Sequence, residues 1–181
     1  MIDASTMLGT FMQSFPGFEL FLNLFVALAG VILTGMALFK FIQLGSHGSG
    51  PGGVTWITPA MYLLSGAALW NFGSSIDTFL ETLYGPSTSV SNLLGYSGAS
   101  SKMPKETQMM LMALISCIRL YGYFTFARAW ISVRKIGSGQ NGSDEVFKSA
   151  SIRLFAGVAL INIVQTTNVA SSTFGFGDVL S

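Results

Sequence analysis

The sequence predicts an all-α membrane protein in which four hydrophobic helices form two tandem helical hairpins, an internal repeat. Half of the 181 residues are hydrophobic and 9% are charged, against about 25% charged in an ordinary soluble domain. The hydrophobic residues gather in four long runs, and a helix needs about 20 such residues to cross a bilayer. A soluble all-helical protein is the alternative, but too few polar residues remain to cover its surface.

A similarity between the two halves of the chain predicts the repeat. Residue pairs align at a nearly constant spacing: Gly45 with Gly137, Gly66 with Gly157, Leu69 with Leu160, Asn71 with Asn162, and Gly85 with Gly175. Similarity at one large spacing is the sequence sign of a duplicated structural unit. The alternative is chance agreement between two stretches that are rich in glycine and alanine.

The N-terminal segment, residues 1–17, is predicted to lie at the membrane interface, because its apolar residues recur near helical spacing until Pro16 breaks the segment. A disordered terminus is the alternative. No Lys or Arg precedes the first apolar run, so we expect no signal peptide here, and a longer precursor stays open.

The first hairpin, residues 18–84, contains predicted spans at about 18–43 and 57–72. Between them, the Gly-rich stretch 45–53 is predicted to be a flexible loop, with His47 as a solvated residue. Asp77 and Glu81 lie one helical turn apart, and we interpret them as the solvated end of a helix rather than as an acid/base pair. Small residues allow close helix packing in membranes. Those expected to do so are Gly30, Gly35, Gly66 and Gly157.

A linker at 85–106, rich in Ser, Gly and Pro, precedes the second hairpin, residues 107–181, with spans at about 108–133 and 151–169. Arg119 lies near the centre of the third span, where an arginine costs about 2.5 to 3.5 kcal/mol. It is the first candidate for a functional residue. A buried ion pair with Asp77 or Glu81, or snorkelling to the interface, is the alternative.

Polar side chains line the last span. Asn162 and Asn168, with Gln165 between them, are expected to pack against other helices or subunits, since such groups seek partners in lipid. A water-filled path is the alternative.

The distribution of positive charge predicts the orientation of the chain. Six basic residues flank the two Gly-rich loops, and two lie on the opposite side: Lys40, Arg128, Arg134, Lys135, Lys148 and Arg153 against Lys102 and Lys105. The positive-inside rule therefore predicts cytoplasmic glycine loops and periplasmic termini.

Motifs for catalysis or nucleotide binding are missing. The Gly-rich loops lack the lysine and hydroxyl of a phosphate-binding loop, and the chain has no G-x-S-x-G, H-E-x-x-H or C-x-x-C motif. A net charge of +1 without a basic cluster argues against direct sequence-specific nucleic-acid binding. We expect no enzymatic activity, no metal and no cofactor, apart from a phospholipid that the chain could bind.

Three motifs carry a resemblance to a known family: G-Q-x-G at 139–142, the pair Ala156-Gly157, and NIV-x-T-x-N from Asn162 to Asn168. They resemble the IcmC/DotE family of type IVB (Dot/Icm) secretion systems, with the related TraQ-like proteins of I-type conjugative plasmids. The similarity is weaker over Phe126 to Trp130 and the first hairpin, and a small residue is typical of the family where Gln165 stands.

This resemblance implies a structural subunit of a secretion or conjugation apparatus in the bacterial inner membrane, with partners among membrane lipid, further copies of the chain and other subunits of the apparatus. The hairpins also look like those of conjugative pilins, so a subunit of an extracellular pilus filament is an alternative, and a small channel or transporter is another. In the pilin interpretation, basic residues would meet lipid phosphates or line a lumen. These candidates are Arg119, Arg128, Arg134 and Lys135.

Overall fold

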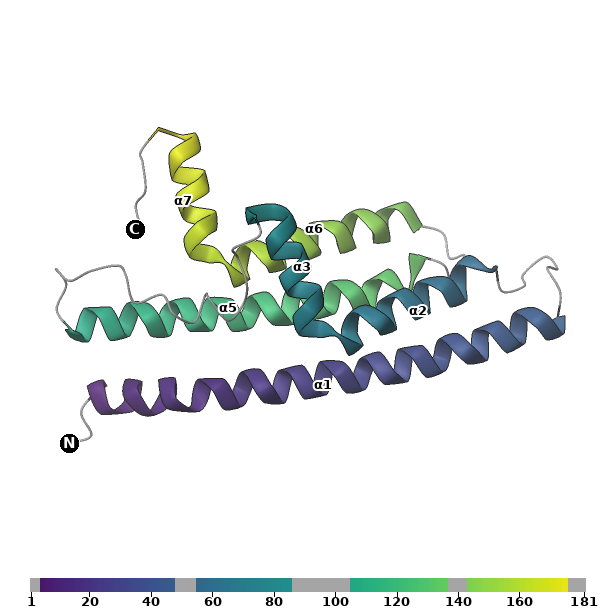
Figure 1. Ribbon diagram of the computed structural model, residues 1–181, viewed down its shortest axis with the longest axis horizontal. Helices are drawn as coiled ribbons and strands as arrows, with labels where there is room; N and C mark the ends of the chain where they lie inside the picture. Colours follow the sequence, from purple (N-terminus) through teal and green to yellow (C-terminus); the bar gives the residue numbers. More distant parts are fainter. Residues whose placement is uncertain (1–3, 48–54, 86–104, 137–142, 176–181) are drawn as a thin grey trace. The chain divides into compact units, whose positions relative to one another are not determined.

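The computed structural model describes residues 4–47, 55–85, 105–136 and 143–175, and within these ranges it contains helices and no strand (Figure 1). The predicted all-helical class is confirmed for this part of the chain. Most of the two glycine loops and of the linker lies outside the described residues. The helices are α1 (Ala4–His47), α2 (Ile57–Trp70), α3 (Phe72–Tyr84), α5 (Lys105–Val133), α6 (Ser143–Ile161) and α7 (Ile163–Thr173).

Among the described residues, two helices are long and apolar enough to cross a membrane. The segments are Gln13–Ser46 of α1 and Met109–Val133 of α5. They correspond to the first and third predicted spans, where the sequence has its longest runs with few charges. The chain therefore has the properties of a membrane protein.

The structure differs from the prediction near both ends of α1. The helix continues through Pro16, so the expected break after the N-terminal segment does not occur. A proline inside a helix removes one N–H donor, and membrane helices tolerate this loss where other groups satisfy the freed carbonyl. At the other end, α1 extends to His47, past Gly45, which was expected to begin the loop.

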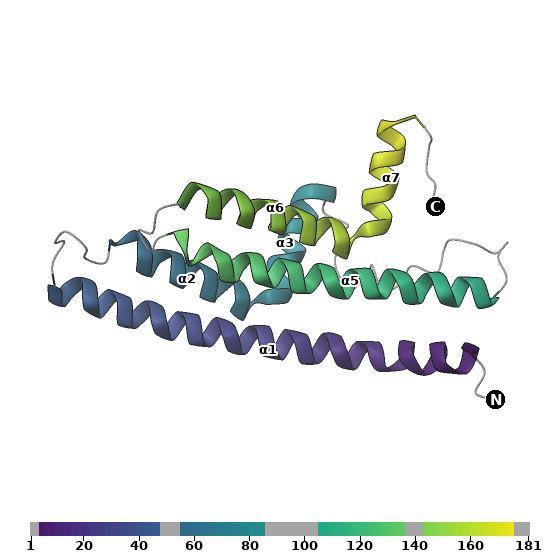
Figure 2. The ribbon, with the colours of Figure 1, turned by 180° about the vertical axis from the view of Figure 1, so that it is seen from behind.

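The second and fourth predicted spans are broken, which corrects the expectation of four continuous membrane helices. α2 has 14 residues, about 21 Å at the usual rise per residue, too short to cross about 30 Å of hydrocarbon. α6 and α7 are bent by 98° at Asn162. If the bent pair is counted as one span, the described residues contain three candidate spans instead of two. Both views show the sharp turn where α6 meets α7 (Figures 1 and 2).

Both breaks occur at an asparagine, and at each a side-chain hydroxyl one turn further on bonds to a carbonyl of the preceding helix. Asn71 has φ −100° and ψ 53°, and Asn162 has φ −111° and ψ 54°, so neither backbone is helical. Asparagine favours such conformations because its side chain competes with the backbone for hydrogen bonds. A run of hydrophobic residues does not reveal this interruption.

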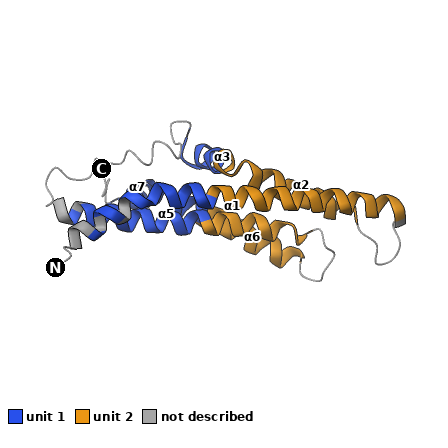
Figure 3. Cartoon of the chain, turned by 90° about the horizontal axis from the view of Figure 1, so that it is seen from below, with its two compact units in different colours: residues 1–22, 76–123, 157–181 blue, residues 23–75, 124–156 orange. Residues whose placement is uncertain are grey.

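The described chain divides into two compact units (Figure 3). Each takes residues from both predicted hairpins. Unit 1 consists of residues 1–22, 76–123 and 157–181, and unit 2 consists of residues 23–75 and 124–156.

Each unit has its own packed interior. In unit 2, the Phe126 ring lies 5.9 Å from that of Phe72 and 6.4 Å from that of Trp130, between centroids, so aromatic packing joins α3 to α5. In unit 1, apolar side chains of α3 and of α6 are fully buried, among them Leu80 and Val158.

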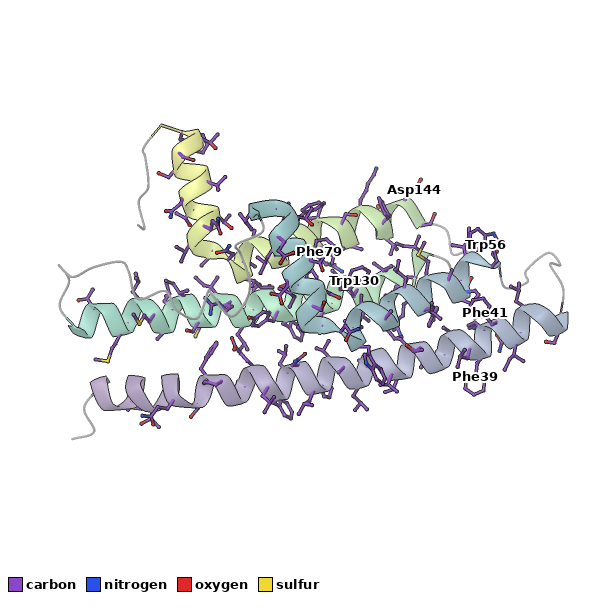
Figure 4. All side chains as sticks on the ribbon, in the orientation of Figure 1. Phe39, Phe41, Trp56, Phe79, Trp130 and Asp144 are labelled. Carbon is purple, nitrogen blue, oxygen red and sulfur yellow. The ribbon has the colours of Figure 1, made fainter. Side chains whose placement is uncertain are left out.

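The outer face of α1 is apolar. Phe21, Phe25 and Phe39 are each about two-thirds exposed, and Phe39 extends from the side of α1 away from α2 (Figure 4). Soluble monomers rarely expose contiguous apolar patches of this kind. The exposed face is therefore suited to contact lipid.

Candidate functional site

A group of ionisable side chains lies in unit 1, and we call it the charged cluster. Its members are Glu19 of α1, Asp77 of α3, and Arg119 and Tyr123 of α5. Arg119 is 6% exposed and Tyr123 is 5% exposed, and their spacing of four residues places them on one face of α5. Glu19 and Asp77 are half-buried. Three helices thus contribute to one buried polar site.

Electrostatic interactions connect the members of the charged cluster. The charges of Glu19 and Arg119 interact, and the Tyr123 side chain interacts with Glu19, Arg119 and Asp77. Opposite charges attract more strongly where water is excluded. The Glu19 carboxylate therefore offsets part of the cost of placing Arg119 in an apolar helix.

The Glu19 carboxylate of this cluster is incompletely hydrogen-bonded. Glu19 Oε1 is buried and accepts no hydrogen bond from the described residues. A buried carboxylate oxygen is costly when its only compensation is a nearby charge. The stability of unit 1 should therefore depend on the cation near Glu19.

The arrangement corrects the expectation for one of the two acidic residues of α3. Glu81 is exposed, whereas Asp77 is half-buried within the charged cluster instead of lying at a solvated helix end. Glu19 was missed as a partner of Arg119 because the two residues are far apart in the chain. The available signal was that Glu19 is the acid immediately before the uncharged stretch 20–39 of the first predicted span.

Close helix crossings occur at two glycine pairs. In unit 2, a Cβ placed on Gly30 would lie 2.5 Å from the Trp70 nitrogen and 2.8 Å from the Gly66 oxygen. In unit 1, a Cβ placed on Gly122 would lie 2.8 Å from the Ile161 nitrogen and 2.9 Å from the Gly157 oxygen. Real Cβ atoms do not approach backbone so closely, so both crossings require glycine.

Gly122 was not among the predicted packing residues, although it follows Gly30 at almost the same spacing as Gly157 follows Gly66. The spacing of the repeat was therefore a signal in the sequence that identifies Gly122. Gly35, which was predicted, does not lie at either crossing: a Cβ there would meet no described atom within 4 Å.

The break at Asn162 is held by polar side chains. The Thr166 hydroxyl is 2.9 Å from the Ala159 oxygen and 2.8 Å from the Asn162 oxygen, and it lies 2.6 Å from the Tyr84 hydroxyl of α3. Carbonyls only accept hydrogen bonds, so Thr166 donates to them and Tyr84 donates to Thr166. Asn162 is 2% exposed, and its Nδ2 donates to Gln165 Oε1 at 2.7 Å.

The break at Asn71 in unit 2 has similar hydrogen bonds. The Ser75 hydroxyl donates to the Ala68 oxygen at 2.8 Å, as Thr166 does to Ala159. The Ser75 amide donates to the Asn71 oxygen at 2.9 Å, and the Thr166 amide donates to the Asn162 oxygen at 3.0 Å. At each break, a side-chain hydroxyl bonds to a carbonyl that the interruption makes available.

The remaining predicted site residues are not members of the charged cluster. Arg128 and Lys135 are exposed, and Arg134 is half-buried, on the C-terminal part of α5 and just beyond it in unit 2. Asn168 is half-buried on α7 in unit 1. The structure thus gathers Arg119 with acidic partners and leaves the other three basic residues near the end of a candidate span.

The described ranges contain no group of three His, Cys, Asp or Glu side chains that could hold a metal ion.

Comparisons with protein-family models, with curated proteins and with solved structures found no match to this chain. The function therefore has to be argued from the residues and their geometry.

Proposed function

We propose that this chain is a non-enzymatic structural subunit of a type IVB secretion or conjugative transfer apparatus, held in the bacterial inner membrane. The observation that carries the proposal is the different placement of polar and apolar side chains. Polar groups in unit 1 interact with one another, whereas large apolar side chains cover the outer face of α1. Such a chain offers surfaces to lipid and to partner helices.

The resemblance to the IcmC/DotE family supports the particular apparatus. Of the motif residues that carry it, Gly157 lies at the close crossing in unit 1 and Asn162 at the break. The G-Q-x-G motif lies outside the described residues. The motif positions that are described therefore have structural roles, which fits a subunit whose contribution is architectural.

A duplication within the chain is part of the proposal. Its support is the repetition of one set of features: a glycine pair at a crossing, an asparagine at a break, and a hydroxyl one turn beyond the asparagine. The corresponding residues are Gly30 and Gly122, Gly66 and Gly157, Asn71 and Asn162, and Ser75 and Thr166. In this proposal, α1 to α3 and α5 to α7 are two tandem copies of one bent hairpin, each with its glycine loop in the cytoplasm.

Broken helices are also a feature of transporters, which bind ions and substrates at interrupted helices. In this chain, side-chain hydroxyls already donate hydrogen bonds to carbonyls at both interruptions. Thr166 donates to the Ala159 and Asn162 oxygens, and Ser75 donates to that of Ala68. Carbonyls that already accept internal hydrogen bonds favour a structural role for the breaks over a binding role.

Deletion and complementation in the host test the proposal. Removal of the gene should abolish transfer of the plasmid or effector, and the wild-type chain should restore it. Gly122→Ala should fail to restore transfer, since the Cβ collides with backbone, while Gly35→Ala should succeed because it meets open space. Transfer at the wild-type level in the deletion strain would refute the role in the apparatus.

Cell fractionation separates a fixed subunit from a pilin. Cells that carry the complete transfer system are sheared, and the chain is sought by immunoblot in the filament and inner-membrane fractions. We expect it to remain in the membrane while a known pilus subunit is released. Recovery in the filament fraction would replace the fixed subunit with a subunit of an extracellular pilus.

A further inference from the structure

An open cavity of about 450 Å³ lies in unit 2, and none of its lining residues belongs to the charged cluster. Its size is within the range of about 300 to 1,000 Å³ that is usual for small-molecule sites. Five of its six lining residues are polar or charged. They are Ser132, Lys135, Glu145, Val146, Ser149 and Arg153. We call this cavity the headgroup pocket.

The headgroup pocket lies at the end of a candidate membrane span. The apolar segment Met109–Val133 ends between Ser132 and Lys135, two of the lining residues. α6 begins at Ser143, and Glu145 is in its first turn, close to Asp144, which Figure 4 shows at the start of this helix. Residues that flank the end of a span lie at the level of the lipid headgroups. A lipid therefore presents its polar part at this depth.

The basic residues of the pocket suit a phosphodiester. Arg153 and Lys135 supply two cations, and the planar guanidinium of arginine matches phosphate oxygens with two parallel donors. Arg153 Nη1 donates to the Ser132 hydroxyl at 3.4 Å, and that hydroxyl donates to the Arg128 carbonyl at 2.9 Å. These bonds orient the guanidinium toward the end of α5 before any ligand binds.

The acidic residue of the pocket selects among headgroups. Glu145 lines the same cavity, and it would repel a purely anionic headgroup while attracting an ammonium group. We propose that the headgroup pocket binds a zwitterionic phospholipid with a primary amine, its phosphate against Arg153 and Lys135 and its ammonium against Glu145. This site does not depend on the proposed role in a transfer apparatus.

Native mass spectrometry of the full-length chain in detergent tests the proposal. The purified protein is titrated separately with phosphatidylethanolamine, with phosphatidylglycerol and with inorganic phosphate. We expect retention of phosphatidylethanolamine in preference to phosphatidylglycerol, and no retention of inorganic phosphate at the same concentrations. Equal retention of the two lipids would overturn the proposed role of Glu145. Retention of inorganic phosphate as strong as that of lipid would overturn the lipid site in favour of a soluble anion.

Matched variants test the proposed contacts of Arg153 with the phosphate and of Glu145 with the ammonium group. Arg153→Gln should weaken retention of both lipids by roughly tenfold, as expected for the loss of one charge-assisted hydrogen bond, while Lys148→Gln on the same helix should not. Glu145→Gln should remove the preference between the lipids, whereas its neighbour Asp144→Asn should keep it. Neither Lys148 nor Asp144 lines the pocket, and both are exposed. Identical behaviour within either pair would refute the site.

Folding of the variants is checked by circular dichroism and by elution volume. Arg153→Lys offers a second variant that keeps the charge and removes the fork. We expect it to bind phosphatidylethanolamine more weakly than the wild type and more strongly than Arg153→Gln. Equal retention by Arg153→Lys and Arg153→Gln, both folded, would contradict a contact between charge and phosphate.

Discussion

The two glycine crossings share a backbone arrangement and differ in what surrounds it. Each brings a glycine against the backbone of a helix that ends at an asparagine break. Three residues before Gly122 stands Arg119, whereas Ala27 stands three residues before Gly30. Because the crossing in unit 2 forms without a charge at that position, the crossing itself does not need an arginine. Arg119 serves the charged cluster instead, as the cation that interacts with Glu19.

Replacement of Arg119 should have the largest effect on stability. Arg119→Leu leaves Glu19 without its nearby cation. Because Glu19 is half-buried, the cost should be about 3 kcal/mol, the lower end of the range for breaking a buried ion pair. The free energy of unfolding, measured by denaturant titration in detergent, should fall accordingly. Arg128→Leu is the control on the same helix, and it should stay close to the wild type because Arg128 is exposed.

A double variant shows whether the loss of stability in Arg119→Leu comes from the loss of charge. Glu19→Gln combined with Arg119→Leu should recover a large part of the loss, because one buried negative charge is removed together with the cation. An equal loss in the single and double variants would mean that the long arginine stem contributes packing alone. In that case the two crossings would not differ in electrostatics as we infer.

Substitution of the glycines tests whether the two crossings are equivalent. Gly30→Ala and Gly122→Ala should each destabilise the protein by about 1 to 3 kcal/mol, the usual cost of forcing extra atoms into a packed site. Gly35→Ala should be neutral or stabilising by up to about 1 kcal/mol, since alanine is the better helix former. Thermal unfolding of the three variants provides the measurement. A harmless Gly122→Ala beside a damaging Gly30→Ala would remove the support for a duplicated hairpin.

The hydroxyl groups at the breaks should matter unequally. Thr166→Val removes a hydroxyl that bonds to two carbonyls and to Tyr84, and buried groups left without partners cost about 1 to 3 kcal/mol. Ser75→Ala removes a bond to one carbonyl and should cost about 0.5 to 1.5 kcal/mol. Denaturant titration of both variants gives the comparison, with Tyr84→Phe to isolate the contact between α3 and α7. A larger loss for Ser75→Ala than for Thr166→Val would reverse the inferred order.

Sequence reasoning succeeded where composition decides the structure. The scarcity of charge and the long apolar runs predicted the all-helical membrane class and the two spans in α1 and α5. It failed at Asn71 and Asn162, because hydropathy averaged over a run does not register one residue whose backbone leaves the helix. A single asparagine is compatible with a continuous helix, and the packing around it decides whether the helix breaks there.

The charged cluster shows a second limit of the sequence. Arg119 was singled out because an arginine in an apolar run is costly in itself, which requires no knowledge of neighbours. Its partner Glu19 lies in another helix, and no spacing rule connects residues on different helices. Tyr123 was missed for a similar reason, since a tyrosine in a membrane helix attracts attention only once acidic groups lie near it.

The smallest expected difference concerns the two asparagines themselves. Asn162 is buried and donates to Gln165, so Asn162→Ala should cost about 1 kcal/mol, the usual worth of a hydrogen bond. Asn71 is exposed, and Asn71→Ala should change the free energy of unfolding by no more than about 0.5 kcal/mol. The measurement is denaturant titration of both variants, with hydrogen exchange of the Thr166 and Ser75 amides as a local report. If the side chain of each asparagine were the cause of its break, both variants would alter exchange at these amides. Because Ser75 and Thr166 already bond to carbonyls at the two breaks, we expect the helices to stay bent and the amide of Ser75 to exchange as in the wild type.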